Sequence, residues 1–305
     1  MPKNVLEVKN LTKNFGNFIA VDDLSFNLKE GEILGLLGQN GAGKTTTIQM
    51  LLGIMKQSEG EIFYFGKNLN ENREKILQEI NFSSTYISLP WFFTVNEILD
   101  VFARLYQIPN KEKRVKKLLE EFEIDHLRKK QYSMLSAGER SRLLLTKAFL
   151  NYPKIILLDE PTSSLDPDIA VKIRSFLIKE RNEYQVSILL TSHNMTEVEE
   201  MCDRIMVIKS GKLIATGTPS QLTKTVSDCR IELNINDVKR AIDFLNSKKI
   251  NFELNKSRFN IKTDEKRISE ILYLLSLEKI DYSEISIFKP DLEDFFLNIV
   301  NKKYD

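Results

Sequence analysis

Hydrophobic and polar residues alternate at the start of this chain, over residues 5–9 and again over residues 24–30. This spacing predicts strands with one buried face, and Gly16-Asn17 predicts a turn between them, so an antiparallel sheet should open the fold. Unbroken apolar runs, which are typical of parallel strands buried on both faces, follow at residues 32–37, 155–158 and 186–190.

Apolar residues recur at helical spacing in four further stretches, which are residues 45–52, 96–105, 115–122 and 143–150. A strand from Ile80 runs into an irregular segment that carries Tyr86, Leu89, Trp91, Phe92 and Phe93. So much aromatic area suits the core of a small helical subdomain, and it equally suits a surface that receives a partner's helix.

Beyond residue 220 the composition shifts toward Asn, Lys and Ile, and the pattern predicts strand, helix, strand, strand, helix, strand. This order is typical of a ferredoxin-like α+β sandwich. A last helix begins after Pro290, with Leu292, Phe295, Phe296 and Ile299 on one face. We therefore expect two domains, residues 1–222 and 223–305. The second carries no catalytic constellation, and it either stabilises or dimerises the protein or senses a ligand.

Composition and charge narrow the function classes. The chain has 305 residues, of which 42% are hydrophobic and 29% charged, as in ordinary globular proteins. Its formal net charge of +1 provides no overall field toward nucleic acid, so no nucleic-acid partner is expected. We expect neither a membrane span nor a signal peptide, because no apolar run is long enough. Cys202 and Cys229 lack metal-ligand spacing.

Candidate chemistry begins with the stretch G-Q-N-G-A-G-K-T-T, between an expected buried strand and an expected helix. In this context the backbone N–H groups of a glycine loop converge on phosphate oxygens at the positive end of the helix. Lys44 would then reach the β- and γ-phosphates of a nucleotide, and the Thr45 hydroxyl would bind Mg²⁺. The expected nucleotide-binding residues are Gly38, Gln39, Asn40, Gly41, Ala42, Gly43, Lys44, Thr45 and Thr46.

The segment L-S-A-G-E at residues 135–139 permits two interpretations. Ser136 and Glu139 are spaced as a capping box, which predicts a well-capped helix. The Ser136 hydroxyl, the Gly138 backbone and a helix N-terminus would also suit an anion.

Two acids, Asp159 and Glu160, end the apolar run at 155–158. The carboxyl edge of an open α/β sheet is where ligands bind. Beside a phosphate loop, Asp159 suits a Mg²⁺-bound water and Glu160 suits polarising the attacking water; the alternative is a turn with two solvated carboxylates. His193, after the run at 186–190, could hydrogen-bond a γ-phosphate or the water. Phe15, beside the expected first turn, either stacks on a base or belongs to the core.

The motifs G-Q-N-G-A-G-K-T, L-S-A-G-E, I-I-L-L-D-E, S-S-L-D and T-S-H occur in this order. Together they resemble the ATP-binding subunit of an ABC transporter over about residues 4–220. The resemblance implies a Walker A loop from Gly38 to Thr46 and a D-loop from Ser164 to Asp166. It also implies Asp159 as the Mg²⁺ aspartate, Glu160 as the catalytic glutamate and His193 as the switch histidine.

The resemblance has further implications for assembly. Ser136 and Gly138, with Asp166 nearby, would serve the nucleotide of a second ATPase subunit, so a homodimer or a pair of ATPase subunits encloses two ATP molecules. Phe15 would stack on adenine. The family's usual glutamine is absent after the strand that begins at Ile80, and the aligned Thr85 has a shorter reach for a Mg²⁺-bound water. The aromatic segment after it would meet an integral membrane permease, at the cytoplasmic face of the cell membrane.

The tail P-D-L-E-D-F-F-L resembles the C-terminal extension of ABC-2 type exporter ATPases. We therefore expect an α/β P-loop ATPase of the ABC type, with antiparallel and helical subdomains, followed by a ferredoxin-like domain. It would use ATP and Mg²⁺ to drive a separate permease. The alternatives are a soluble ABC ATPase that acts on ribosomes or an assembly scaffold, and an ATP-gated regulator that scarcely hydrolyses.

Overall fold

The computed structural model describes residues 3–85, 87–225 and 228–301. Tyr86, which belongs to the predicted aromatic segment, lies outside the described residues. The chain divides into two compact units, Met1–Pro219 and Ser220–Asp305. Among the described residues, no helix is both long and apolar enough to cross a bilayer.

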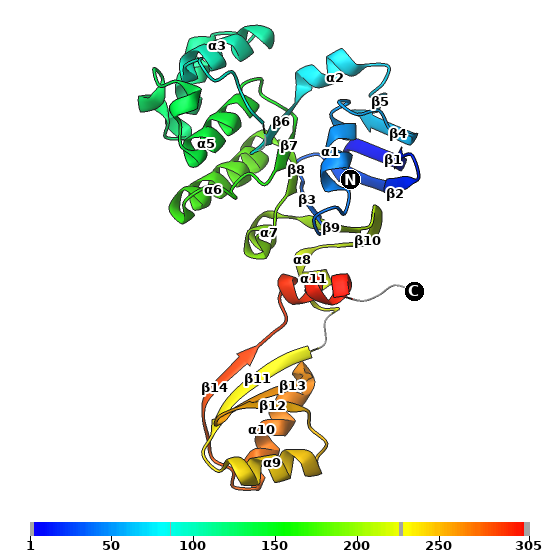
Figure 1. Cartoon of the computed structure of the whole chain (residues 1–305), viewed down its shortest axis with the longest axis vertical. Helices are drawn as coiled ribbons and strands as arrows, with labels where there is room; N and C mark the ends of the chain where they lie inside the picture. Colours follow the sequence, from blue (N-terminus) through cyan, green and yellow to red (C-terminus); the bar gives the residue numbers. More distant parts are fainter. Residues whose placement is uncertain (1–2, 86, 226–227, 302–305) are drawn as a thin grey trace. The chain divides into compact units, whose positions relative to one another are not determined.

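A six-stranded sheet forms the centre of the first unit, with the strand order β10-β9-β3-β8-β7-β6 (Figure 1). Its strands are β3 (Ile33–Leu37), β6 (Ile80–Ser84), β7 (Ile155–Asp159), β8 (Ser187–Thr191), β9 (Arg204–Lys209) and β10 (Lys212–Gly217). All pair in parallel except β10, which pairs antiparallel with β9. Every residue of β3, β7 and β8 is buried, which confirms the prediction from their apolar runs. The carboxyl ends of the parallel strands therefore share one edge.

A four-stranded antiparallel sheet carries the N-terminal hairpin, in the order β2-β1-β4-β5. Its strands are β1 (Asn4–Phe15), β2 (Phe18–Lys29), β4 (Glu59–Tyr64) and β5 (Lys67–Asn68). The predicted turn at Gly16-Asn17 is confirmed, but β1 is longer than its alternating stretch. Register shifts between Val8 and Lys13 explain the difference, because each irregularity interrupts the spacing of two.

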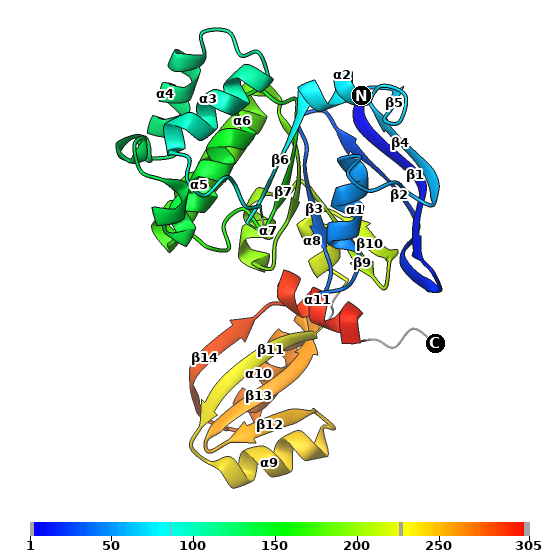
Figure 2. The same cartoon turned by 45° about the horizontal axis from the view of Figure 1, so that its top comes forward.

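Helix α1 (Lys44–Leu51) lies between the two sheets, and one hydrophobic core joins all three elements (Figures 1 and 2). Buried members of this core include Leu24 of β2, Leu36 of β3 and Ile48 of α1. Helices α6 (Pro167–Tyr184) and α7 (Met195–Met201) lie on the other side of the six-stranded sheet. The sheet edge that presents the motifs is thus fixed from both faces.

A helical subdomain follows β6 in the chain. Its helices are α3 (Val95–Leu105), α4 (Lys111–Glu121) and α5 (Ala137–Ala148), with short 3-10 turns at Asp125–Leu127 and Tyr132–Met134, while α2 (Arg73–Glu79) precedes β6. In the aromatic segment Leu89 is buried, whereas Trp91, Phe92 and Phe93 are 54%, 82% and 43% exposed. The described part of the segment therefore contributes one residue to the core and three to the surface.

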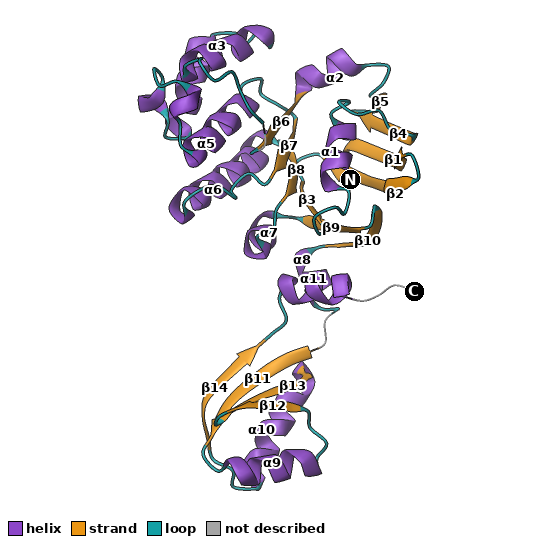
Figure 3. Cartoon of the chain, in the orientation of Figure 1, coloured by secondary structure: helices purple, strands orange, loops and turns teal. Residues whose placement is uncertain are grey.

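The second unit has the predicted ferredoxin-like order (Figure 3). Its elements are β11 (Asp228–Ile235), α9 (Val238–Ser247), β12 (Phe252–Asn255), β13 (Arg258–Asp264), α10 (Ile268–Leu277) and β14 (Tyr282–Phe288). The sheet is antiparallel in the order β12-β13-β11-β14. The last helix, α11 (Leu292–Asn301), buries Leu292 and Phe295, and α8 (Pro219–Thr223) stands at the boundary between the units.

Candidate functional site

The segment from Gly38 to Thr46, here called the P-loop, leaves the carboxyl end of β3 and continues into α1. At two positions of the P-loop only glycine fits, because a larger side chain would collide with a neighbouring strand. A Cβ atom on Gly38 would lie 2.6 Å from the carbonyl oxygen of Ile208 in β9. One on Gly43, whose φ is 105°, would lie 2.5 Å from the carbonyl oxygen of Ala20 in β2. The P-loop is therefore held tightly between β2 and β9.

We expect Gly43→Ala to lower the free energy of unfolding by about 3 kcal/mol, because it combines a left-handed φ with contact against a backbone carbonyl. Gly41→Ala is the matched control: its φ is 80°, but a Cβ there would meet nothing within 4 Å. Gly41→Ala should lower the free energy of unfolding by only about 1 kcal/mol, the penalty for a left-handed backbone in a residue with a Cβ atom. Urea denaturation of both variants measures the difference, and equal losses would contradict the packing argument.

Gly211, in the turn between β9 and β10, connects the P-loop to β2 through two backbone hydrogen bonds, here called the Gly211 brace. Its N–H donates to the Ala42 carbonyl and its own carbonyl accepts from the Asp22 N–H, each at 3.0 Å. A Cβ on Gly211 would lie 2.9 Å from the Ala20 carbonyl oxygen, and its φ is 80°. Sequence reasoning missed this residue, since its partners are distant in the chain.

Lys44 is buried within the P-loop. Its Nζ donates to the carbonyl oxygens of Gly38 at 2.6 Å and Gln39 at 3.2 Å. Burial lowers the pKa of Lys44, while the nearby carboxylates of Glu160 and Asp159 oppose that shift. A buried ammonium group satisfied mainly by carbonyls is a strong attractor for an anion entering the loop.

The Asp159 carboxylate is fixed by the strands on both sides. Its Oδ1 accepts from Thr191 Oγ1 at 2.7 Å, and its Oδ2 accepts from Ser84 Oγ at 3.2 Å. Each hydroxyl belongs to the last residue of its strand, a positional signal that sequence reasoning did not use. Thr85, the next residue, lines a separate cavity of about 240 Å³ that also contains Arg140.

Glu160 adopts a left-handed backbone with φ of 54° directly after β7. Its N–H donates to Thr191, and its Oε2 accepts from the His193 N–H at 3.3 Å. The other oxygen, Oε1, is buried and lies 3.2 Å from His193 Nε2, yet it has no hydrogen-bond partner within the described chain. Burial raises the pKa of Glu160, opposed by His193. A carboxylate with a spare acceptor and a raised pKa is suited to take a proton from water.

These residues surround one cavity of about 280 Å³, here called the P-loop cavity. Its lining is Phe15, Phe18, Ala20, Gln39, Asn40, Gly41, Gly43, Lys44, Thr45, Thr46, Asp159, Glu160 and His193. Phe18 was missed by sequence reasoning, although it faces Phe15 across the predicted turn. The two rings are 48% and 63% exposed, which leaves them available to a ligand.

Six predicted site residues do not line this cavity. Gly38 and Ala42 lie within the P-loop, Thr85 lines the separate cavity of about 240 Å³, and Ser136, Gly138 and Asp166 belong to other segments. The capping box is confirmed, since Ser136 Oγ accepts from the Glu139 N–H at 3.2 Å and Glu139 Oε2 accepts from the Ser136 N–H at 2.7 Å. Ser136 and Asp166 are exposed, and a Cβ on Gly138 would lie 3.3 Å from the Ser164 carbonyl oxygen. The N-terminus of α5 is thus a separate surface that packs on the segment 164–166.

A phosphate loop after the buried strand β3, with two carboxylates at the end of β7 two strands away in the same sheet, defines a P-loop ATPase. The ABC transporter family model matches residues 21–163. Over 98% of its length the chain is 34% identical to YhcH of Bacillus subtilis, an uncharacterized ABC transporter ATP-binding protein, and covers 97% of that protein. The chain belongs to the ATP-binding proteins of ABC transporters, and it is the subunit that binds and hydrolyses ATP.

Two further similarities complete the comparison. Over 75% of its length the chain is 37% identical to a Nod factor export ATP-binding protein of Neorhizobium galegae, of which it covers 67%. Among solved structures, an ATP-binding subunit of an ABC transporter superposes with a TM-score of 0.68 at 28% identity, over 72% of this chain and 92% of that one. The predicted fold class and family are therefore confirmed.

Proposed function

We propose that this chain powers an ABC-2 type exporter as a dimeric ATPase, bound to a separate permease at the cytoplasmic face of the membrane. The observation that carries the proposal is the position of Ser136 and Gly138 outside the P-loop cavity. Their helix N-terminus is exposed and suited to an anion, yet the described chain presents it away from its own P-loop. A second copy, turned head to tail, would bring this surface onto the nucleotide, with Asp166 at the same contact.

Within each copy the P-loop would bind the phosphates of ATP. Lys44 would leave its loop carbonyls to neutralise the β- and γ-phosphates, while backbone N–H groups from Gln39 to Thr46 orient them. Glu160 would accept the proton of the attacking water, and His193 would position that water or the γ-phosphate. Catalysis would rest on orientation and on preorganised charge.

The site also suits Mg²⁺. This ion prefers one or two carboxylates together with phosphate oxygens, and the fixed Asp159 carboxylate beside the Thr45 hydroxyl offers such ligands. When bound, Mg²⁺ withdraws charge from the phosphate oxygens. Asp159 would hold it directly or through a water, Thr45 would bind it, and Thr85 would contribute through a water at most. Phe15, with Phe18 across the turn, would stack on the adenine ring.

The exposed rings of Trp91, Phe92 and Phe93 form the proposed contact with the permease. An exposed cluster of large apolar side chains marks an interaction site more often than a free surface. The relative from Neorhizobium galegae is named for export, which supports that direction of transport. The second unit, proposed as an accessory domain from about residue 223, would stabilise or help dimerise the subunit.

The permease contact can be tested in native membranes. We expect the tagged chain, after gentle solubilisation, to copurify with a multi-spanning protein in stoichiometric amount, and Phe92→Asp to lose that protein while keeping its ATPase activity. Tyr273→Asp, at another exposed aromatic ring, in α10, is the control and should retain the partner. Recovery of the chain with ribosomes or a soluble complex alone would refute the export proposal.

A further inference from the structure

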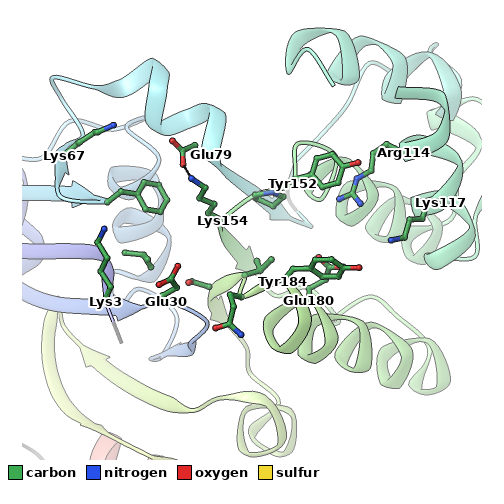
Figure 4. Close-up of a pocket in the computed structure, with 16 residues that line it drawn as sticks. Lys3, Glu30, Lys67, Glu79, Arg114, Lys117, Tyr152, Lys154, Glu180 and Tyr184 are labelled. Atoms are coloured by element: carbon green, nitrogen blue, oxygen red, sulfur yellow. Dashed lines mark ion pairs between the residues drawn. The ribbon is translucent and has the colours of Figure 1, made fainter. Parts of the chain in front are cut away.

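A larger cavity, of about 620 Å³, lies at the other end of the same parallel strands (Figure 4). We call it the amino-edge cleft, because Glu79, Lys154 and Ser187, which line it, lie where β6, β7 and β8 begin. Asp159 is at the far end of β7, five residues from Lys154 and thus about 16 Å away at the rise of a strand. The amino-edge cleft is therefore distinct from the P-loop cavity.

One wall of the cleft carries two tyrosine rings, each paired with a cation from helix α4. The Cζ atom of Arg114 lies 3.8 Å from the ring centroid of Tyr152, and Lys117 Nζ lies 5.9 Å from that of Tyr184. Figure 4 shows these four side chains on the same side of the opening. Tyr152 and Tyr184 are 57% and 56% exposed, so their rings remain accessible to a ligand. Such cation–aromatic pairs present positive charge beside a flat apolar surface.

The opposite wall repeats this chemistry. Lys154 Nζ lies 5.5 Å from the ring centroid of Phe65 and 2.5 Å from a carboxylate oxygen of Glu79. Glu79 is therefore largely neutralised by its partner. A molecule in the cleft would meet aromatic surface on both sides, together with ammonium groups at the rim.

Arg114 is a buried cation in the lining of the cleft. Its guanidinium group donates through Nη2 to the Phe149 carbonyl oxygen. No carboxylate among the described residues forms an ion pair with it, and its buried Nε has no hydrogen-bond partner in the described chain. Glu180 lies near enough to attract it, and burial raises the pKa of that carboxyl, a shift that Arg114 and Lys117 oppose. A buried cation without an ion-pair partner favours the arrival of an anion.

The charged residues that line the cleft give it a net positive charge. Its cations are Lys3, Lys67, Arg114, Lys117 and Lys154, against the carboxylates of Glu30, Glu79 and Glu180. Ligand pockets commonly occupy about 300–1,000 Å³ and combine aromatic walls with a few charged groups. We propose that the amino-edge cleft binds a small anionic molecule that contains an aromatic ring. The ring stacks between Tyr184 and the facing wall, and the anionic group lies against Lys117 and Arg114.

The fluorophore anilinonaphthalene sulfonate is a suitable probe, because it joins an aromatic system to one negative charge. Its uncharged counterpart, phenylnaphthylamine, keeps the rings and lacks the sulfonate. Both are titrated against the full chain with Mg²⁺ and saturating ADP, so that the P-loop cavity is filled. We expect one saturable sulfonate site per chain that phenylnaphthylamine occupies at least about tenfold more weakly, which is the discrimination expected from one charged contact.

Substitutions at two exposed residues of the cleft test where the sulfonate probe binds. Tyr184→Ala removes the stacking ring, Lys117→Glu reverses the charge beside it, and each should weaken the saturable site at least about tenfold. Tyr273→Ala, at a tyrosine of similar exposure in the second unit, should leave it unchanged. Equal binding of the charged and uncharged probes, or a titration that neither cleft variant alters, would overturn the proposal.

Discussion

Replacing Glu160 with glutamine should lower steady-state ATP hydrolysis by about 10²- to 10⁴-fold while leaving ATP binding intact. The reason is the carboxylate itself: its Oε1 has no hydrogen-bond partner in the described chain, and burial raises its pKa, so it can receive a proton. Glutamine has nearly the same shape but cannot accept that proton. Mg²⁺-dependent phosphate release measures the loss.

Because the variant still binds ATP, the closed dimer should accumulate, and size-exclusion chromatography with ATP should show twice the mass of the nucleotide-free chain. Glu183→Gln, at an exposed glutamate of α6, serves as the control and should hydrolyse ATP normally. If Glu160→Gln kept more than about a tenth of the wild-type rate, another group would have to be the base.

Lys44→Ala should weaken ATP binding by about 10- to 100-fold, as expected for one lost hydrogen bond between charged groups. It should also reduce turnover by about 10²- to 10³-fold, the usual effect of removing one preorganised donor. The fold should survive, because the hydrogen bonds of the Lys44 ammonium within the described residues go to carbonyls of the loop itself, those of Gly38 and Gln39. Isothermal titration with ATP and Mg²⁺ gives the affinity.

Lys29→Ala removes an exposed lysine at the end of β2 and is the matched control for charge. It should bind ATP as the wild type does. Unchanged ATP affinity in Lys44→Ala would show that the backbone N–H groups of the P-loop suffice, and would remove Lys44 from the proposed site.

The parts of the fold that sequence predicted best are those where spacing and motif agree. The apolar runs of β3 and β7 end at motifs with a known chemical role, so both the strands and their functional ends could be predicted. Helix α6, beginning at Pro167, was not predicted, although a proline in the first turn of a helix is a usual start signal. Many charged residues are interspersed among its apolar positions, so the helical spacing is hard to recognise in the sequence.

The supporting contacts of the site were harder to predict, because they join residues far apart in the chain. Ser84 and Thr191 reach Asp159 only after three strands have come into register. Phe18 joins Phe15 through the hairpin pairing. A pattern within one segment contains no information on such neighbours, whereas parallel pairing of β6, β7 and β8 determines them.

The Gly211 brace has a consequence for the newly made protein. The P-loop is synthesised early, but its support from the turn after β9 comes from a residue about 170 positions later. Domains fold as units while the chain emerges, so the early segment must wait for this turn. A ribosome-bound chain that stops before Gly211 would lack both the brace and the neighbouring strand β10. We therefore expect the subunit to hold nucleotide only when its first unit is almost fully translated.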